Sequence, residues 1–292
     1  MQKSKNRIKS FAYWMVVILL ITLNGLHIMD HWIQYSDKEV KSFFDKSGVP
    51  FHIHYLDSPQ GKIRIIESGS ADRETVIIYI HGAPGTWDAY KKYLADLSLL
   101  QKAHLIAYDR PGYGKTYQGG PVPDLESQAD FLRTIIKDLT SAENIILFSH
   151  SYGGPIAAKY MSMYPDNHTT HLMIAPAIDP LTEKYFWISP LGYWKLTKWL
   201  LPKSYVSASF EKCTHEQELK ILKTELSKIK GKTHHVHGMK DWIAPPRGNI
   251  DLVRNSFPSQ TTTIDTLKNG GHLLIWDHYD FLLSKLLNII KD

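Results

Sequence analysis

Short apolar runs recur along the chain from residue 50 onward and are separated by longer segments with helical spacing. Such runs are typical of parallel strands that are buried on both faces, and they lie at residues 75–80, 104–109, 144–149 and 171–177. Helical patterns fill the intervals at residues 88–97, 125–140 and 154–164. Alternation of this kind predicts right-handed crossovers and an α/β fold with a doubly wound, mostly parallel sheet.

The flanking regions extend this pattern. Residues 50–68 predict an antiparallel hairpin at a sheet edge, because two extended runs flank the turn residues Asp57 to Gly61. Strands resume at residues 232–238 and 261–266, and a closing helix follows at 277–290. Residues 179–230 are rich in Trp, Tyr, Lys and Leu and contain no convincing strand. We therefore expect a helical insertion there.

The first 35 residues are different in character. No charged side chain occurs between Lys9 and Asp30, and residues 11–29 reach the length of about 20 residues that a membrane-spanning helix needs. Basic residues precede this stretch, so the positive-inside rule keeps the amino terminus in the cytoplasm and the body outside it. We expect an uncleaved signal anchor. A cleaved signal peptide is the alternative, although no Ala-x-Ala site follows the apolar run.

Composition excludes several classes of protein. The 292 residues are 43% hydrophobic and 22% charged, which excludes disorder, collagen and coiled coil. The single Cys213 cannot form an internal disulfide, and no Cys/His spacing resembles a zinc site, so no metal is expected. The net charge of +5 includes four basic residues among the first ten, so nucleic acid is not an expected partner. The oligomeric state is not indicated.

A candidate nucleophile follows the run at 144–149. That run leads into His150-Ser151-Tyr152-Gly153-Gly154 and then into a helical pattern, which is the strand, sharp turn and helix context of a nucleophile elbow. Residues two before and two after such a serine must be small, and here they are Ser149 and Gly153. The usual motif has glycine where this chain has Ser149. The alternative role for Ser151 is to cap the helix.

A second turn could stabilise an oxyanion. The run at 75–80 ends in His81-Gly82-Ala83-Pro84-Gly85, whose glycines bring the backbone close to another group. We expect the backbone N–H groups of Ala83 and Tyr152 to form an oxyanion hole. The turn at residues 109–114 is expected to be a structural feature beneath the site.

A serine nucleophile needs a histidine base and a carboxylate that orients it. His272 follows Gly270-Gly271 just after the last predicted strand, and Asp241 follows the strand at 232–238. The order Ser151, Asp241, His272 is that of the hydrolase triad. Asp179 is the alternative acid. His234 and His235 would point to opposite faces of their strand, which argues against a metal cluster there.

With these motifs in order, residues 50–292 resemble the α/β-hydrolase family, in particular its cap-bearing members with an HGxPG oxyanion motif. The resemblance implies the α/β-hydrolase fold with a cap. With the amino-terminal segment, we expect four parts: a basic tail and anchor (1–35), a first core part (50–178), a helical cap (179–230) and a second core part (231–292). The family also contains epoxide hydrolases and dehalogenases, but these use an aspartate nucleophile where this chain has Ser151.

The cap composition suggests an apolar pocket. Trp187, Trp194 and Trp199 are candidate substrate-binding residues, and the alternative is that these rings only fill the cap's own core. Lys195, Lys198 and Lys203 would suit a surface resting on anionic lipid.

The leading functional hypothesis is a membrane-anchored serine hydrolase that cleaves an apolar or lipid-like carboxylic ester through an acyl-enzyme, without a cofactor. The enzymatic alternative is an amidase or an aminopeptidase of the proline-iminopeptidase type. The non-enzymatic alternative is a ligand-binding protein on a hydrolase scaffold.

Overall fold

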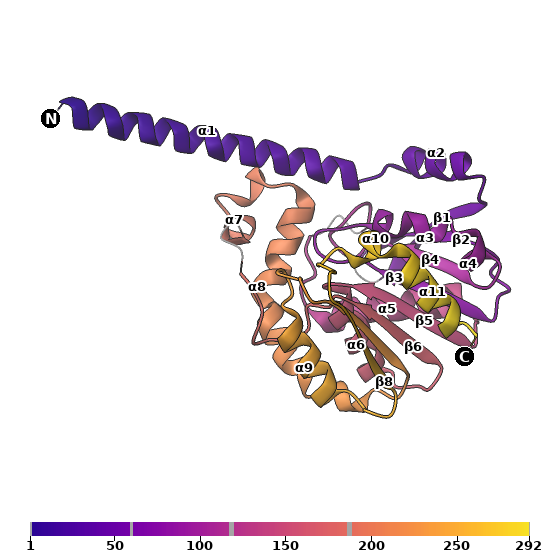
Figure 1. Ribbon diagram of the computed structural model, residues 1–292. Helices are drawn as coiled ribbons and strands as arrows, with labels where there is room; N and C mark the ends of the chain where they lie inside the picture. The colour runs from indigo at the N-terminus through magenta and orange to yellow at the C-terminus, as the bar shows by residue number, and fades with distance from the viewer. Residues whose placement is uncertain (1, 59–60, 117–119, 186–188, 292) are drawn as a thin grey trace.

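A computed structural model describes residues 2–58, 61–116, 120–185 and 189–291 (Figure 1). Its centre is an eight-stranded sheet in the order β1-β2-β4-β3-β5-β6-β7-β8, in which β1 and β2 are antiparallel and β4, β3 and β5 to β8 run parallel. The strands are β1 Phe51–Ser58, β2 Gly61–Ser68, β3 Thr75–Ile80, β4 His104–Tyr108, β5 Asn144–His150, β6 Thr169–Ile174, β7 Thr233–Gly238 and β8 Thr262–Leu267. The mostly parallel sheet and its antiparallel edge hairpin are confirmed.

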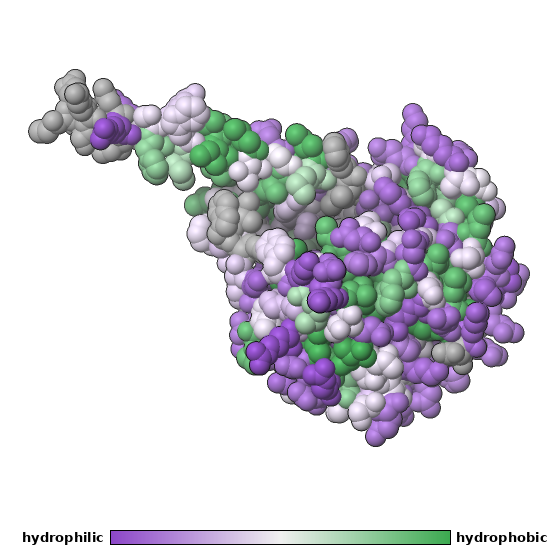
Figure 2. Space-filling model, in the orientation of Figure 1, coloured by the Kyte–Doolittle hydropathy of each residue, from purple (hydrophilic) through white to green (hydrophobic). Residues whose placement is uncertain are grey.

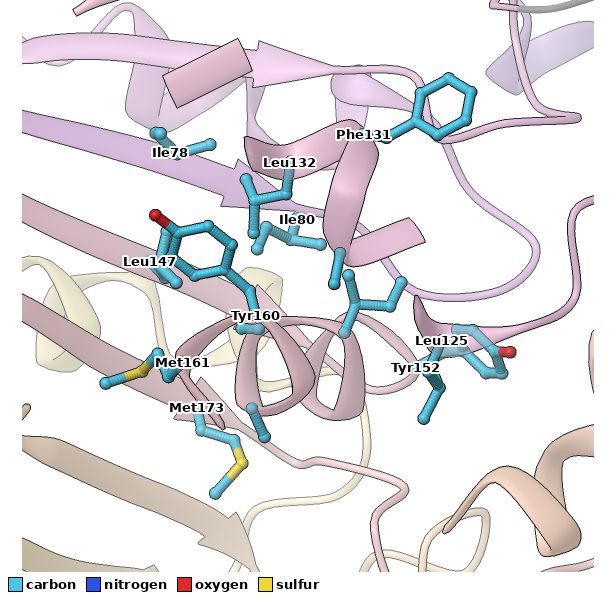
Figure 3. Packing of buried hydrophobic residues seen from close by; sticks show 14 of the residues in the cluster. Ile78, Ile80, Leu125, Phe131, Leu132, Leu147, Tyr152, Tyr160, Met161 and Met173 are labelled. Carbon is cyan, nitrogen blue, oxygen red and sulfur yellow. The ribbon is translucent and has the colours of Figure 1, made fainter. Parts of the chain in front are cut away.

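Helices cover both faces of the sheet, as expected for a doubly wound fold (Figure 1). One face packs against α5 (Leu125–Leu139), α6 (Gly153–Met163) and α9 (Pro246–Ser256), and Figure 3 shows Leu132 and Tyr160 from these helices beside Leu147 of β5. The other face is covered by α2 (Asp37–Ser47), η1 (Trp87–Tyr90), α3 (Lys91–Leu94), α4 (Leu97–Leu100), α10 (Leu274–Asp277) and α11 (Tyr279–Ile289). Both faces of the central strands are therefore apolar, which explains their continuous apolar runs.

Two of these helices were not expected from the sequence. Helix α2 begins with a capping box, because the Ser36 hydroxyl accepts the Glu39 N–H and the Glu39 carboxylate accepts the Ser36 N–H. It buries only Val40 and Phe44, so its apolar face is narrow. Helix α9 follows Pro245 and has Pro246 in its first turn, where a missing N–H costs nothing.

The segment between β6 and β7 is helical in its described residues and contains no strand among them. It holds α7 (Ser189–Tyr193), η2 (Lys198–Leu200), α8 (Lys203–Lys223) and η3 (Leu226–Lys228). We call residues 179–230 the cap, although the division of the chain into four parts stays a prediction.

Helix α1 (Gln2–Ile33) projects from the body and passes over α7 and α8 (Figure 1). Residues 9–31 of this helix are long and apolar enough to cross a membrane, and only 6% of the most apolar window is buried inside the structure. Figure 2 shows apolar residues exposed along it. A span or a signal sequence would have this character.

Candidate active site

Three residues far apart in the sequence meet at the carboxyl edge of the sheet. Ser151 follows β5, Asp241 lies beyond β7, and His272 lies beyond β8. The Ser151 Oγ lies 3.0 Å from the His272 Nε2, and the His272 Nδ1 lies 2.7 Å from the Asp241 Oδ2. A neutral imidazole that donates from Nδ1 to the carboxylate presents its free Nε2 to the hydroxyl. The structure thus brings together the three residues expected to act as nucleophile, base and acid.

The turn that holds Ser151 is tight. Ser151 has a φ of 53°, in the left-handed region that non-glycine residues seldom adopt. Gly153 allows this turn, because a Cβ there would lie 2.3 Å from the Ile80 carbonyl oxygen. The unusual Ser149 fits because its buried hydroxyl lies 2.7 Å from the His171 Nε2. The serine at this position is therefore accommodated by a hydrogen bond.

Asp241 is held as a carboxylate by its surroundings. Burial raises its pKa, but hydrogen bonds from His237 and His272 outweigh burial and hold the pKa well below its ordinary value. The backbone N–H groups of Ile243 and Ala244 also donate to its Oδ1, both at 2.9 Å. Asp241 is therefore ionised and can orient His272 by accepting its Nδ1–H.

Asp179, the alternative acid, is engaged elsewhere. Its carboxylate accepts the Thr182 hydroxyl at 2.9 Å and the Leu181 N–H at 3.2 Å. These are local bonds at the start of the cap. His272 is paired with Asp241 instead.

The two expected oxyanion donors line the same cavity as Ser151. Within the described residues, neither the Ala83 N–H nor the Tyr152 N–H donates to a protein carbonyl or side chain. A Cβ on Gly82 would lie 3.0 Å from the Ser151 Cβ, so the turn at residues 81–85 is packed directly against the nucleophile. Two N–H groups are therefore available where a carbonyl oxygen could enter.

The turn at residues 109–114 supports the oxyanion turn from below. The Arg110 N–H donates to the His81 Nε2 at 2.9 Å, and the Arg110 guanidinium donates to the Gly82 carbonyl at 3.1 Å. Burial, with the nearby Arg110, holds the pKa of His81 well below its ordinary value, so this imidazole stays neutral. The same guanidinium pairs with Glu211 of α8 at 2.6 Å, which ties the cap to the core.

A cavity of about 590 Å³ opens above Ser151. Its apolar wall comes from the core loops, the cap and the end of α1, namely Met29, Ala89, Tyr205, Ile243, Leu273 and Trp276. Trp194 and Trp199 are not among its lining residues, and their side chains are exposed on the outside of the cap. Trp187 lies outside the described residues. The pocket is thus apolar, but its aromatic residues are not the expected ones.

Several further residues at the site were not singled out from the sequence. His237, on the same strand as His234 and His235, points its Nε2 at Asp241 from 3.3 Å. His150 donates its Nε2–H to the His272 carbonyl at 2.8 Å, and burial lowers the His150 pKa to about 3, so the ring is neutral. The cavity wall also contains a cluster of three polar side chains. The Glu183 carboxylate accepts a hydrogen bond from Lys212 and lies 3.0 Å from the His215 Nδ1.

Comparison with known proteins agrees with this architecture. A family model described as "alpha/beta hydrolase fold" matches residues 75–198. A cis-3-alkyl-4-alkyloxetan-2-one decarboxylase from Shewanella oneidensis is 30% identical over 40% of this chain and 36% of its own length. A bifunctional esterase/perhydrolase from Acinetobacter calcoaceticus is 28% identical over 37% of this chain and 39% of its own length. The chain therefore spans little more than a third of these two relatives.

Among solved structures, a membrane phospholipase A described as a bacterial virulence factor superposes with a TM-score of 0.63. It covers 97% of this chain and 99% of its own, at 18% sequence identity. At that identity the likeness supports the fold alone.

Proposed function

Because the chain belongs to the α/β-hydrolase family, we propose that it is a serine hydrolase that cleaves carboxylic esters through an acyl-enzyme intermediate. One observation carries the proposal: the continuous path from the Asp241 carboxylate through His272 to the Ser151 hydroxyl, with spacings of 2.7 and 3.0 Å, at the floor of an open cavity. This spacing suits proton transfer from the hydroxyl to the imidazole.

In the proposed mechanism the Ser151 Oγ attacks the ester carbonyl while His272 takes its proton. Asp241 stabilises the imidazolium, and the N–H groups of Ala83 and Tyr152 bind the oxyanion. His272 then gives the proton to the departing alcohol. The acyl group of the substrate stays bound to the Ser151 Oγ as an ester. Water, activated by the same imidazole, releases the acid and restores the serine.

The lining of the cavity favours an ester with an apolar acyl or alcohol part. Met29, Leu273 and Trp276 face the space beside the nucleophile, and burial of each substrate methylene against them would contribute about 0.8 kcal/mol. One relative is described as a bifunctional esterase/perhydrolase, which is consistent with this class.

An aminopeptidase is the second candidate, since Glu183 and Glu211 line the cavity and a carboxylate could bind a substrate amine. Both carboxylates already have cationic partners, however. Arg110 pairs with Glu211 at 2.6 Å, and Lys212 bonds Glu183. A free amine would have to displace a buried ion pair, which is costly. A panel of p-nitrophenyl esters and aminoacyl amides separates the two activities, and faster turnover of every amide than of any ester would favour the peptidase.

We also propose that α1 anchors the enzyme, with the catalytic body on the extracytoplasmic side. The proposal rests on the apolar helix at residues 9–31 and on the basic residues that precede it. A reporter fused after Asp292 should then be active only as an exported fusion, and the mature chain should retain residues 1–30. A product that begins near Asp30 would show that a signal peptide is cleaved.

A further inference from the structure

The outer end of the cap presents large apolar side chains to solvent. We call residues 194–200, which join α7 to η2 and include η2, the cap tip. The side chains of Trp194, Leu196 and Trp199 are 55%, 87% and 73% exposed. Three such residues within one short turn are unusual for a surface that faces only water.

Four backbone N–H groups of the cap tip, those of Trp194, Thr197, Lys198 and Leu200, donate to carbonyls within the cap. The Thr197 and Lys198 N–H groups donate to the Trp194 carbonyl, and the Leu200 N–H donates to the Thr197 carbonyl. The Trp199 indole N–H donates to the Leu196 carbonyl at 2.9 Å, and the Thr197 hydroxyl donates to the Leu191 carbonyl at 2.8 Å. Each of these paired groups keeps its hydrogen bond when the turn leaves water, which lowers the cost of insertion.

The cap tip is attached to the candidate membrane span. The His27 imidazole donates to the Leu200 carbonyl at 3.1 Å, and the Ser204 hydroxyl donates to the Asp30 carboxylate. Leu23, four residues before His27 on the same helical face, is 7% exposed in a helix whose other apolar residues are largely exposed. Figure 1 shows α7 lying beneath this part of α1.

These contacts fix the depth of the cap tip relative to the span. The His27–Leu200 bond lies four residues before His31, where the apolar stretch ends. Four residues of helix correspond to about 6 Å. If residues 9–31 cross the bilayer, the level of this bond is in the interfacial zone and the outermost acyl region.

The charge of the cap tip fits the same location. Lys195 and Lys198 alternate with the apolar residues and are exposed, and Lys203 is exposed just beyond them. No acidic residue occurs between Ser189 and Tyr205. Tryptophan and lysine together are typical of side chains at the level of lipid headgroups, and lysines near an anionic surface are attracted to it.

From these observations we propose that the cap tip is a second membrane contact, which inserts Trp194, Leu196 and Trp199 into the anionic lipid leaflet beside α1. The proposal rests on the anchoring role given to α1 above. It also places the catalytic cavity at the membrane surface, because Met29, one residue before the bonded Asp30, is part of the cavity wall. An ester with a long acyl chain could then enter from the leaflet.

The test measures lipid contact in the full chain reconstituted in nanodiscs. In a Cys213→Ser background, Leu196→Cys is labelled with an environment-sensitive dye, and nitroxide-bearing lipids serve as the quencher. Leu97→Cys is the matched control, because Leu97 is a leucine that is 68% exposed on α4 of the core. We expect the label at position 196 to lose most of its emission to the lipid nitroxide and the label at position 97 to keep it. Equal emission at both positions would overturn the proposal.

Charge is tested in the same system. The quenching at position 196 should be stronger with anionic than with zwitterionic lipid, and Lys195→Glu with Lys198→Glu should abolish that difference. If the quenching at position 196 did not depend on lipid charge, the proposal that the leaflet is anionic would be contradicted. If a second copy of the chain covers the cap tip instead, the label at position 196 would be protected from the nitroxide and cysteines at position 196 would crosslink between copies.

This readout is separable from the proposed hydrolysis and anchoring. Quenching requires no turnover, so it can succeed in a protein without esterase activity. Cleavage of α1 would appear as a shortened chain before reconstitution, whereas failure of the cap contact would leave an intact, anchored chain with an unquenched label.

Discussion

The carboxylate of Asp241 is approached from behind by His237, whose Nε2 lies 3.3 Å from the same oxygen that pairs with His272. The position of His237 is itself determined by its neighbours. Its Nε2–H is shared between the Ala244 carbonyl at 2.9 Å and the Asp241 carboxylate at 3.3 Å, so its Nδ1 is the acceptor for the His235 Nε2–H, also at 2.9 Å. Buried imidazoles of fixed tautomer thus support the acid of the triad.

A first prediction concerns this support. His237→Phe removes a hydrogen bond to a charged carboxylate, and such bonds contribute about 1.5–3 kcal/mol. We expect kcat to fall by about tenfold or more with KM little changed. Because His237 helps to lower the pKa of Asp241, its removal leaves a more basic carboxylate that holds a proton on the His272 imidazole more tightly, and the acid limb of the pH–rate profile should move to higher pH. His237→Gln, which retains an N–H donor, should recover part of both effects. A purely structural role would leave the pH profile unmoved.

A second prediction separates the two candidate acids. Asp241→Asn should lower kcat by about 10⁴-fold, because the imidazole loses the carboxylate that fixes its tautomer. Asp179→Asn should stay within a few-fold of wild type, since its bonds are to Thr182 and Leu181. Steady-state kinetics on one ester checks both variants. The reverse ranking would make Asp179 the acid.

A third prediction concerns the apolar wall of the cavity. An ester series lengthened from two to about six carbons should gain steeply in kcat/KM, since each buried methylene contributes about 0.8 kcal/mol. Trp276→Ala should flatten this dependence, because Trp276 lines the cavity and packs edge-on against His150. Leu97→Ala, at an exposed leucine of α4 that does not line the cavity, should keep the wild-type slope. An enzyme indifferent to acyl length would contradict the proposed substrate class.

A fourth prediction concerns stability and pH. Burial raises the pKa of Asp88 to about 6, although the Thr86 hydroxyl bond and Lys91 partly oppose it. The folded state therefore binds this proton more tightly than the unfolded chain, so this group's contribution to the free energy of unfolding falls as pH rises from about 4 to 6. Asp88→Asn should remove that slope and stabilise the protein at pH 7 by roughly 1–2 kcal/mol, allowing for partial solvent screening. Denaturant unfolding at several pH values measures this, and an unchanged slope would contradict it.

The sequence predicted the strands well because the central strands are buried on both faces. Predicted and observed β3 both comprise residues 75–80, and β5 ends one residue later than predicted. The site motifs were found for the same reason, since each one follows such a strand. Helices α2 and α9 were missed because most of their residues are polar, so the apolar residues that they bury form only a narrow stripe in the sequence.

The features that were missed at the site depend on where side chains point in the folded chain, and residue type alone does not reveal this. His237 points toward Asp241 only because the chain turns sharply between them. The cap is rich in aromatic residues, but composition cannot tell which face of a helix turns inward. The structure places Trp194 and Trp199 outside, whereas the cavity wall takes Trp276 from a core helix.

The central claim is that Ser151 is the nucleophile, and covalent labelling with a fluorophosphonate probe tests it most directly. The wild-type chain should be labelled at Ser151, and Ser151→Ala should lose the label while its circular dichroism spectrum and unfolding midpoint stay close to wild type. Ser284→Ala, on the exposed face of α11, should be labelled like wild type. Labelling that persists in Ser151→Ala at another serine would contradict the account.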